Sequence, residues 1–234
     1  MLDPTSGCNL NFEGCWAGAY NKYDELSYEE VNRLVEEVKE MGIHFITMSG
    51  GDPLLWQHLF DLFASHTDVA FTLYTNGTLI DREMAARLKE LGNVSLAIGL
   101  EGLRELKGAR RGEGVFDRVM EAIDALKEHG QVFGISLTLT RQNWEKVLSD
   151  EFIDLLIEKG VLYGWSFYYI PRGSDPNFDL VLEPEERGEL VKRVRQISRN
   201  KPLPLADFWN DGELANGCIA GGRCYFHITA AGDV

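Results

Sequence analysis

The pattern of hydrophobic and polar positions divides the chain into alternating strands and helices. Short apolar runs predict buried strands, and the segments between them repeat apolar residues at helical spacing. Ser27 and Glu30 form a capping box at the start of one helix, and Gly42 follows its end. Strands are predicted at 43–49, 69–74, 94–100, 132–140, 161–170 and 224–229. Further helices are predicted at 54–65, 82–91, 115–129, 143–159 and 185–199, and residues 200–217 are predicted to be irregular.

This alternation, at intervals of about 25–38 residues, is typical of right-handed βαβ units around a parallel sheet. Six units are visible when residues 1–5 are taken as the end of a first strand, which is too few for a closed eight-stranded barrel. We therefore predict an α/β fold, a partial (βα)6 TIM-like barrel with an open parallel sheet. The barrel is assigned to residues 1–200, and residues 201–234 to the start of a small C-terminal extension.

Loops of unusual composition follow the predicted strands. They lie at 5–20, 50–53, 75–78, 102–113 and 171–174. Parallel sheets bind ligands at the carboxyl ends of their strands, where such loops come together. The sequence thus predicts one composite site. The aromatic residues Trp165, Tyr168 and Tyr169 in the strand at 161–170 are interpreted as core rather than as a substrate platform.

The charge of the chain argues against a nucleic-acid partner. Among its 234 residues, 23 Lys and Arg stand against 37 Asp and Glu, and no cationic stripe is present that would follow a phosphate backbone. No apolar run is long enough to span a membrane, and the N-terminus lacks the pattern of a signal peptide. We expect a cytoplasmic protein with neither nucleic acid nor a membrane as partner.

Four cysteines gather near the two ends of the chain. Cys8 and Cys15 lie in a Gly/Asn-rich loop, and Cys218 and Cys224 lie near the C-terminus. In a reducing compartment they are ligands or inert thiols rather than disulfides. Soft thiolates on a short loop suit iron–sulfur or zinc chemistry. A zinc site made from all four is an alternative, although their spacing differs from that of the usual zinc motifs.

Several loop motifs together resemble a known family. They are Cys8–Cys15, Ser49–Pro53, Thr75–Thr78, Leu100–Gly102 and Arg110–Gly112. In this order they are similar to the motifs of the radical S-adenosylmethionine (SAM) superfamily. The C-terminal cysteines resemble those of its SPASM/Twitch members, which carry auxiliary clusters. The resemblance covers nearly the whole chain and implies the partial barrel predicted above.

The resemblance implies a [4Fe–4S] cluster and SAM as cofactors. Three thiolates leave one iron of such a cluster open to an outside ligand, and in this family that iron chelates SAM. An electron from a flavodoxin- or ferredoxin-type donor then splits SAM to give a 5′-deoxyadenosyl radical, which abstracts hydrogen from the substrate. The SPASM-like tail implies a peptide or protein substrate by analogy with many relatives.

Site residues are carried over position by position. Cys8 and Cys15 would be ligands of the cluster. Arg111 would face the SAM carboxylate as a fork-shaped donor, with a solvated surface arginine as the alternative. Asn76 borders the same pocket, more as a turn former than as a ligand, and Trp16 either covers the cofactors or packs within its loop. The methionine amino group would be received by the GGEP-like residues Gly50, Gly51, Asp52 and Pro53, whose glycines let the main chain approach a ligand.

Three positions depart from the family pattern. Phe12 stands where the middle cysteine of CxxxCxxC would be, and a phenyl ring cannot ligate iron. Asp52 is one methylene shorter than the usual glutamate, and Gly99 stands where relatives commonly have a serine. Two functional hypotheses follow: a radical SAM enzyme, or a non-catalytic domain that has lost its cluster and serves binding only.

The C-terminal cysteines resemble the opening of an auxiliary-cluster motif. Cys218 and Cys224 are followed by Gly232–Val234, and a further cysteine would come a few residues later. The sequence ends before that position and begins with only the end of a strand. We therefore expect a longer parent chain that completes an auxiliary iron–sulfur cluster.

Overall fold

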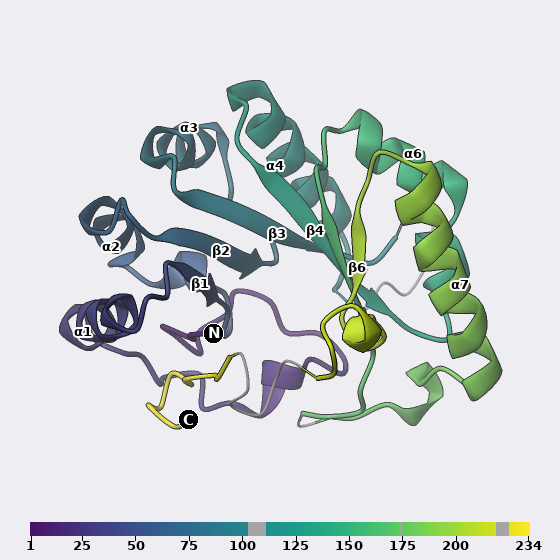
Figure 1. Ribbon diagram of the computed structural model, residues 1–234, viewed down its shortest axis with the longest axis horizontal. Coiled ribbons are helices and arrows are strands. Elements are labelled where there is room, and N and C mark those ends of the chain that lie inside the picture. Colours follow the sequence, from purple (N-terminus) through teal and green to yellow (C-terminus); the bar gives the residue numbers. More distant parts are fainter. Residues whose placement is uncertain (103–110, 174, 219–224) are drawn as a thin grey trace.

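The chain folds as a curved sheet with helices along its outer side, as the computed structural model shows (Figure 1). The structure describes residues 1–102, 111–173, 175–218 and 225–234. Within these residues, six parallel strands lie side by side in chain order. The predicted open α/β half-barrel is confirmed. The strands are β1 (Phe45–Met48), β2 (Ala70–Thr75), β3 (Val94–Leu100), β4 (Phe133–Leu139), β5 (Gly164–Tyr168) and β6 (Leu205–Asp207).

Helices with strong end signals begin and end close to where the sequence predicts. α1 (Tyr28–Glu40) begins at the predicted capping box, where the Ser27 hydroxyl accepts a hydrogen bond from the Glu30 amide. α3 (Arg82–Leu91) begins after Asp81, and Gly92 ends it in the left-handed region. The remaining α-helices are α2 (Leu59–Ser65), α4 (Val115–His129), α5 (Trp144–Val147), α6 (Asp150–Glu158) and α7 (Pro184–Asn200). Short 3-10 helices are η1 (Trp16–Ala19), η2 (Pro53–Leu55), η3 (Phe178–Leu180) and η4 (Asp211–Glu213).

Two helices predicted as continuous are interrupted. The segment 54–65 divides into η2 and α2, because Trp56 turns into the core and its indole N–H donates to the Leu26 carbonyl at 2.9 Å. The segment 143–159 divides into α5 and α6, because the Ser149 hydroxyl accepts from the Phe152 amide and starts a new helix. Both breaks come from single side chains that apolar periodicity does not reveal.

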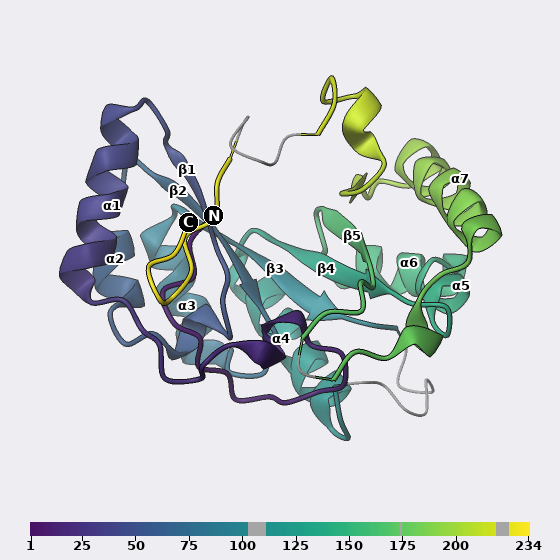
Figure 2. The same ribbon diagram turned by 90° about the horizontal axis from the view of Figure 1, so that it is seen from below.

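The C-terminal part of the prediction is partly wrong. Residues 200–217 were predicted to be irregular, yet Leu205–Asp207 forms β6 and pairs with β5. The predicted strand at 224–229 is reduced in the described residues to a single bridge between Ile228 and Leu2. Leu2 also bridges to Met48, so the expected first strand is only a contact beside β1. The two termini consequently lie close together near β1 (Figures 1 and 2).

The hydrophobic core lies between the convex face of the sheet and the helices. Successive side chains of a strand point to opposite faces. Leu96 and Ile98 of β3 and Ile135 and Leu137 of β4 are fully buried on the helix side, in a core that includes Val119 of α4. None of the described helices is long and apolar enough to cross a membrane.

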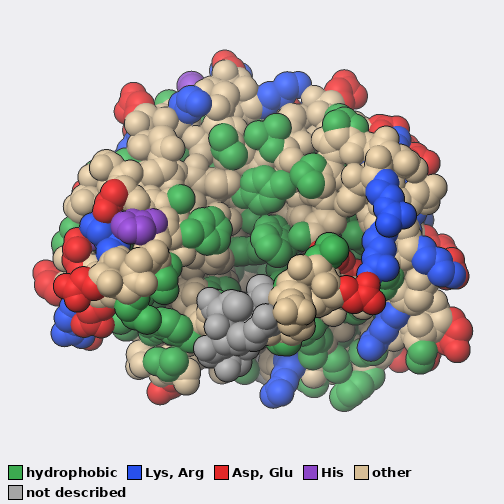
Figure 3. Space-filling model, viewed as in Figure 1, with side chains coloured by type: hydrophobic (Ala, Val, Ile, Leu, Met, Phe, Trp, Pro, Cys, Tyr) green, Lys and Arg blue, Asp and Glu red, His purple; other side chains and the backbone are tan. Residues whose placement is uncertain are grey.

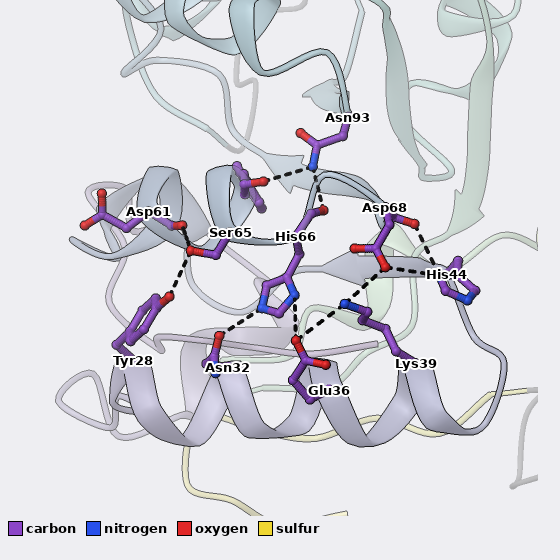
Figure 4. Close-up of polar contacts among 11 residues, drawn as sticks. Tyr28, Asn32, Glu36, Lys39, His44, Asp61, Ser65, His66, Asp68 and Asn93 are labelled. Atoms are coloured by element: carbon purple, nitrogen blue, oxygen red, sulfur yellow. Dashed lines mark hydrogen bonds and ion pairs between the residues drawn. The ribbon is translucent and has the colours of Figure 1, made fainter.

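A buried histidine links α1 to α2 outside the sheet (Figure 4). The His66 side chain is 2% exposed; its Nε2 lies 2.9 Å from Asn32 Oδ1 and its Nδ1 lies 3.4 Å from Glu36 Oε1. Burial lowers the pKa of His66 and Lys39 adds to this, whereas the carboxylates of Glu36 and Asp68 oppose it. These contacts join the two helices, so His66 has a structural role.

The lowered pKa of His66 predicts an acid-sensitive fold. The unfolded chain takes up a proton at an ordinary histidine pKa of about 6.5, before the folded chain does. The free energy of unfolding is therefore expected to fall as the pH is lowered through that value. Urea unfolding at a series of pH values should show a smaller fall for His66→Gln than for wild type. Equal slopes would contradict the assignment.

Candidate functional site

A cavity of about 1120 Å³ lies on the concave side of the sheet. Hydrophobic side chains gather around the hollow of this face (Figure 3). A closed TIM barrel fills the corresponding space with bulky branched side chains. Here the residues of β3 and β4 that alternate with the core residues are small, and they leave the space open. They are Ala97, Gly99, Ser136 and Thr138.

The N-terminal loop packs its backbone directly against the loop after β1. The Gly51 amide donates to the Thr5 carbonyl at 3.1 Å. A Cβ on Gly51 would lie 2.1 Å from the Gly7 carbonyl oxygen, and one on Gly50, which has a φ of 114°, would lie 2.3 Å from the Thr5 oxygen. The two glycines predicted to admit a ligand therefore also admit the backbone that leads to Cys8.

Asp52 ties the loop after β1 to the end of β2. Its carboxylate is fully buried and accepts hydrogen bonds from the Thr75 hydroxyl (2.9 and 3.0 Å), the Asn76 amide (2.9 Å) and the Leu54 amide (3.1 Å). Burial raises the pKa of this carboxyl, while these hydrogen bonds and the charge of Arg111 oppose the rise. Asp52 thus fixes the GGEP-like loop with respect to β2.

Cys8 and Cys15 both line the cavity and are partly buried. The Cys8 sulfur accepts hydrogen bonds from the Leu10 amide (3.4 Å) and the Asn76 side-chain amide (3.8 Å). Burial raises the pKa of the Cys8 thiol; the charges of Asp52 and Cys15 act in the same direction, and the two hydrogen bonds act against them. The structure therefore brings the two predicted ligands to one cavity.

Phe12 lies over the arginine that was predicted to bind SAM. The central carbon of the Arg111 guanidinium lies 4.9 Å from the ring centroid. Arg111 Nε donates to Glu101 Oε1 at 3.0 Å, and the two side chains are only 13% and 6% exposed. The guanidinium packs on Gly99, where a Cβ would lie 2.7 Å from both terminal nitrogens. A serine at position 99 would therefore displace Arg111 from this position.

Asn76 both forms the turn after β2 and contacts the cysteine loop. Its side-chain oxygen accepts from the Thr78 amide at 2.9 Å, which makes it a turn former. Its side-chain nitrogen donates to Asn9 Oδ1 at 2.8 Å and to the Cys8 sulfur, so it also holds the cysteine loop.

The other predicted site residues are spread more widely. Pro53 opens η2 directly after Asp52 and is buried. Trp16 lines the cavity from η1, is 46% exposed and packs edge-to-face on Tyr20 at 5.4 Å. Cys218 is exposed. Cys224 lies outside the described residues, as does Arg110.

Aromatic residues of the cavity wall were not anticipated from the sequence. Trp165, Tyr168 and Tyr169 were interpreted as core, yet all three line the cavity together with Phe167 and Phe208. The period-two spacing of Trp165 and Phe167 places these two rings on one face of β5 and could have indicated this. Glu101, the partner of Arg111, carried too weak a signal to be chosen.

The polar groups that line the cavity suit SAM, whereas the cysteines of the N-terminal loop do not form a complete ligand set for a [4Fe–4S] cluster. Gly50, Gly51, Asn76 and the Arg111 guanidinium line one cavity and supply backbone and side-chain polar groups of the kind that suit a zwitterionic ligand such as SAM. Among the described residues, no group of three or more His, Cys, Asp or Glu side chains could hold a metal ion. Cys8 and Cys15 offer two thiolates, and Phe12 leaves the three-thiolate set incomplete.

Comparisons with known proteins identify the family of the chain and support its fold. Residues 2–156 match the Radical SAM superfamily profile. The Fe-coproporphyrin III synthase of Methanosarcina barkeri (strain Fusaro / DSM 804) is 33% identical over 203 residues, which cover 82% of this chain and 50% of the synthase. The mycofactocin maturase MftC of Mycolicibacterium smegmatis (strain ATCC 700084 / mc(2)155) is 30% identical over 245 residues, covering 98% and 61%. The crystal structure of Streptococcus suis SuiB bound to precursor peptide SuiA has a TM-score of 0.75 at 16% identity, covering 96% and 52%.

The chain matches only part of the length of each of these relatives. The chain spans about half of the synthase and of SuiB, and 61% of MftC. The likeness to SuiB supports the fold, and the matched profile runs from residue 2 to residue 156, within α6.

Proposed function

From the premise that this chain belongs to the radical SAM superfamily, we propose that it is the barrel domain of an enzyme that starts a radical reaction by hydrogen abstraction. Family membership implies SAM and a [4Fe–4S] cluster as cofactors. The observation that carries the proposal is the convergence of Cys8, Cys15, the loop Gly50–Pro53, Asn76 and Arg111 on one cavity at the carboxyl ends of the strands.

In this proposal the chain's own residues bind and orient SAM. The backbone of the Gly50–Pro53 loop receives the methionine amino group, Asn76 holds that loop near Cys8, and Arg111 faces the carboxylate. The chemistry supplied when SAM and the cluster are bound is formation of a 5′-deoxyadenosyl radical. Cys8 and Cys15 are the proposed cluster ligands, and Phe12 makes their hold on it weak.

We propose a peptide or protein as substrate, because MftC is a maturase by name and SuiB binds a precursor peptide. A tetrapyrrole is the second candidate, since the Fe-coproporphyrin III synthase is 33% identical to this chain. A flavodoxin- or ferredoxin-type protein is the proposed electron donor. Cytoplasmic location is proposed as well, because Cys8 and Cys15 are free thiols, as is usual for cysteines in a reducing compartment.

The division into a barrel at 1–200 and an extension at 201–234 remains a proposal, with β6 joining the barrel sheet from beyond residue 200. Cys218 and Cys224 are proposed as ligands of an auxiliary iron–sulfur cluster. Trp16 is proposed to cover the bound cofactors from the cavity rim, which its exposure permits.

The proposal is tested on the chain reconstituted anaerobically with iron and sulfide. Equilibrium dialysis with labelled SAM measures binding, and chromatography after addition of dithionite measures 5′-deoxyadenosine. SAM binding together with reductant-dependent 5′-deoxyadenosine supports the enzyme. SAM binding without the product supports the non-catalytic alternative, and absence of SAM binding overturns the proposal.

Replacement of Arg111 by lysine is expected to weaken SAM binding about tenfold, because lysine keeps the charge beside Glu101 but loses the planar fork that suits a carboxylate. Arg141→Lys is the control, since Arg141 also pairs with a glutamate, Glu183 (2.9 Å), but this pair is half exposed and Arg141 does not line the cavity. Equal dissociation constants for the two variants would remove Arg111 from the SAM site.

A further inference from the structure

Aromatic rings form a continuous wall along one side of the cavity. We define the aromatic wall as Tyr74, Trp165, Phe167, Phe208 and Trp209. Ring centroids are 6.0 Å apart for Tyr74 and Phe167, 6.4 Å for Trp165 and Phe167, 5.0 Å for Phe167 and Phe208, and 5.1 Å for Phe208 and Trp209. All five residues line the cavity. Trp209 is 47% exposed, so the wall runs from the interior of the half-barrel to solvent.

The outer end of the wall is fixed by a buried carboxylate. Asp207 accepts hydrogen bonds from the Asn210 side chain (2.8 and 2.9 Å), the Trp209 amide (3.3 Å) and the Tyr168 hydroxyl (3.3 Å). The Phe208 amide donates to the Ser166 carbonyl at 3.2 Å. The turn after β6 therefore holds its two aromatic rings in place without a ligand, and the wall is preorganised.

The sheet beside the wall leaves room for a flat group. Ser136 pairs with Trp165 and Thr138 with Phe167 across β4 and β5, so each ring stands next to a small side chain. Ala97 continues this low surface on β3. A planar group can lie over the small side chains and contact the rings of the wall, as offset or edge-to-face aromatic contacts require.

The charged side chains that line the cavity, among the described residues, are all positive. Among the described residues that line it, the charged side chains are Lys22, Arg111 and Arg172. No Asp or Glu is among the described lining residues, although the chain as a whole has 37 of them against 23 Lys and Arg. Arg111 is paired with Glu101, which leaves Lys22 and Arg172 at the rim to attract anions.

We propose that the aromatic wall is the substrate-binding surface and that the substrate is an aromatic compound bearing carboxylates. This inference rests on the proposed function, whose substrate class it narrows. Stacking on the wall selects an aromatic group, and the cationic rim selects carboxylates over ammonium groups. A tetrapyrrole carboxylate and an acidic peptide with aromatic side chains are two sources of this chemistry, and aliphatic or basic peptides are excluded.

The tetrapyrrole source is tested by measuring the binding of coproporphyrin III to the chain without added iron, sulfide or SAM. Binding is measured from the absorbance of the porphyrin and from the quenching of tryptophan fluorescence. A cationic porphyrin of similar size is the charge control. The anionic porphyrin is expected to bind at least about tenfold more tightly, and Trp165→Leu to weaken it about tenfold. Tyr23→Leu is the matched control, because Tyr23 is 92% exposed and does not line the cavity.

The peptide source is tested by measuring the binding of an acidic tetrapeptide that contains two tyrosines. Two control peptides are compared with it: in one, leucine replaces each tyrosine, and in the other, lysine replaces each aspartate. Tight binding of either probe supports the inference when it depends on Trp165 and weakens with added salt. Phe208→Leu replaces Trp165→Leu if the latter unfolds earlier on heating. The inference is overturned if neither probe binds. It is also overturned if the control peptides bind as tightly as the original peptide and the cationic porphyrin binds as tightly as coproporphyrin III. Because no cofactor is added, this failure is separate from failure of SAM binding.

Discussion

Phe12→Cys is expected to convert a chain that loses its cluster into one that retains it. Wild type offers two thiolates on the loop, Cys8 and Cys15, and a [4Fe–4S] cluster held by two of its irons exchanges or falls apart more readily than one held by three. The variant supplies the third thiolate at the spacing of the resembled motif. After anaerobic reconstitution and desalting, we expect about four irons per chain for the variant and substantially fewer for wild type, with the cluster's visible absorbance following the iron content.

Phe12→Cys both adds a thiolate and removes the phenyl ring, and the control Phe12→Ser removes the ring without adding a thiolate. This control also removes the aromatic contact with Arg111, whose guanidinium lies 4.9 Å from the ring centroid, yet adds no soft ligand. It is expected to resemble wild type in iron content. Equal iron retention by wild type and Phe12→Cys would show that another group completes the site in the natural sequence. Equal retention by both variants would assign the effect to the ring.

Elements with local end signals could be predicted almost to the residue. The Ser27 box, the Asp81 cap and Gly92 all act within one turn of the helix that they delimit. β3 and α4 have the predicted bounds because strong apolar runs or helical spacing are flanked by glycine. In these segments the sequence near a residue determines its conformation, and packing agrees with it.

Elements that depend on distant partners could not be predicted. β6 has three residues, too few for a periodic pattern, and exists because Leu205 pairs with Gly164 across the sheet. Trp56 interrupts a helical segment because its indole finds the Leu26 carbonyl 30 positions earlier. Such contacts carry no signal in the neighbouring sequence.

In the site, too, some features follow from the order of the strands and others depend on contacts between distant residues. The loops that carry Cys8, Gly51 and Asn76 could be placed at one edge of the sheet from topology alone. The packing of Phe12 on Arg111 could not, because it depends on the path of the N-terminal loop over the sheet. The hollow interior likewise depends on strand register, which sets small residues of β4 beside the rings of β5.

Gly51→Ala tests whether the N-terminal loop and the loop after β1 form one unit. A Cβ at this position would lie 2.1 Å from the Gly7 oxygen and 2.4 Å from the Ser6 oxygen. Both are backbone atoms of the segment that leads to Cys8, so neither can turn aside as a side chain would. Overpacking of this kind is expected to lower the free energy of unfolding by about 1–3 kcal/mol, measured by urea unfolding, and to weaken SAM binding to the reconstituted chain.

Gly188→Ala is the matched control, because its Cβ would meet no atom within 4 Å on the exposed side of α7. There alanine removes the entropic cost of glycine in a helix, and stability is expected to rise by about 0.5–1 kcal/mol. The same chemical change thus has opposite signs at the two positions, and only the change at Gly51 should alter SAM binding. Unchanged stability and SAM binding in Gly51→Ala would mean that the cysteine loop does not rest on the loop after β1 in solution.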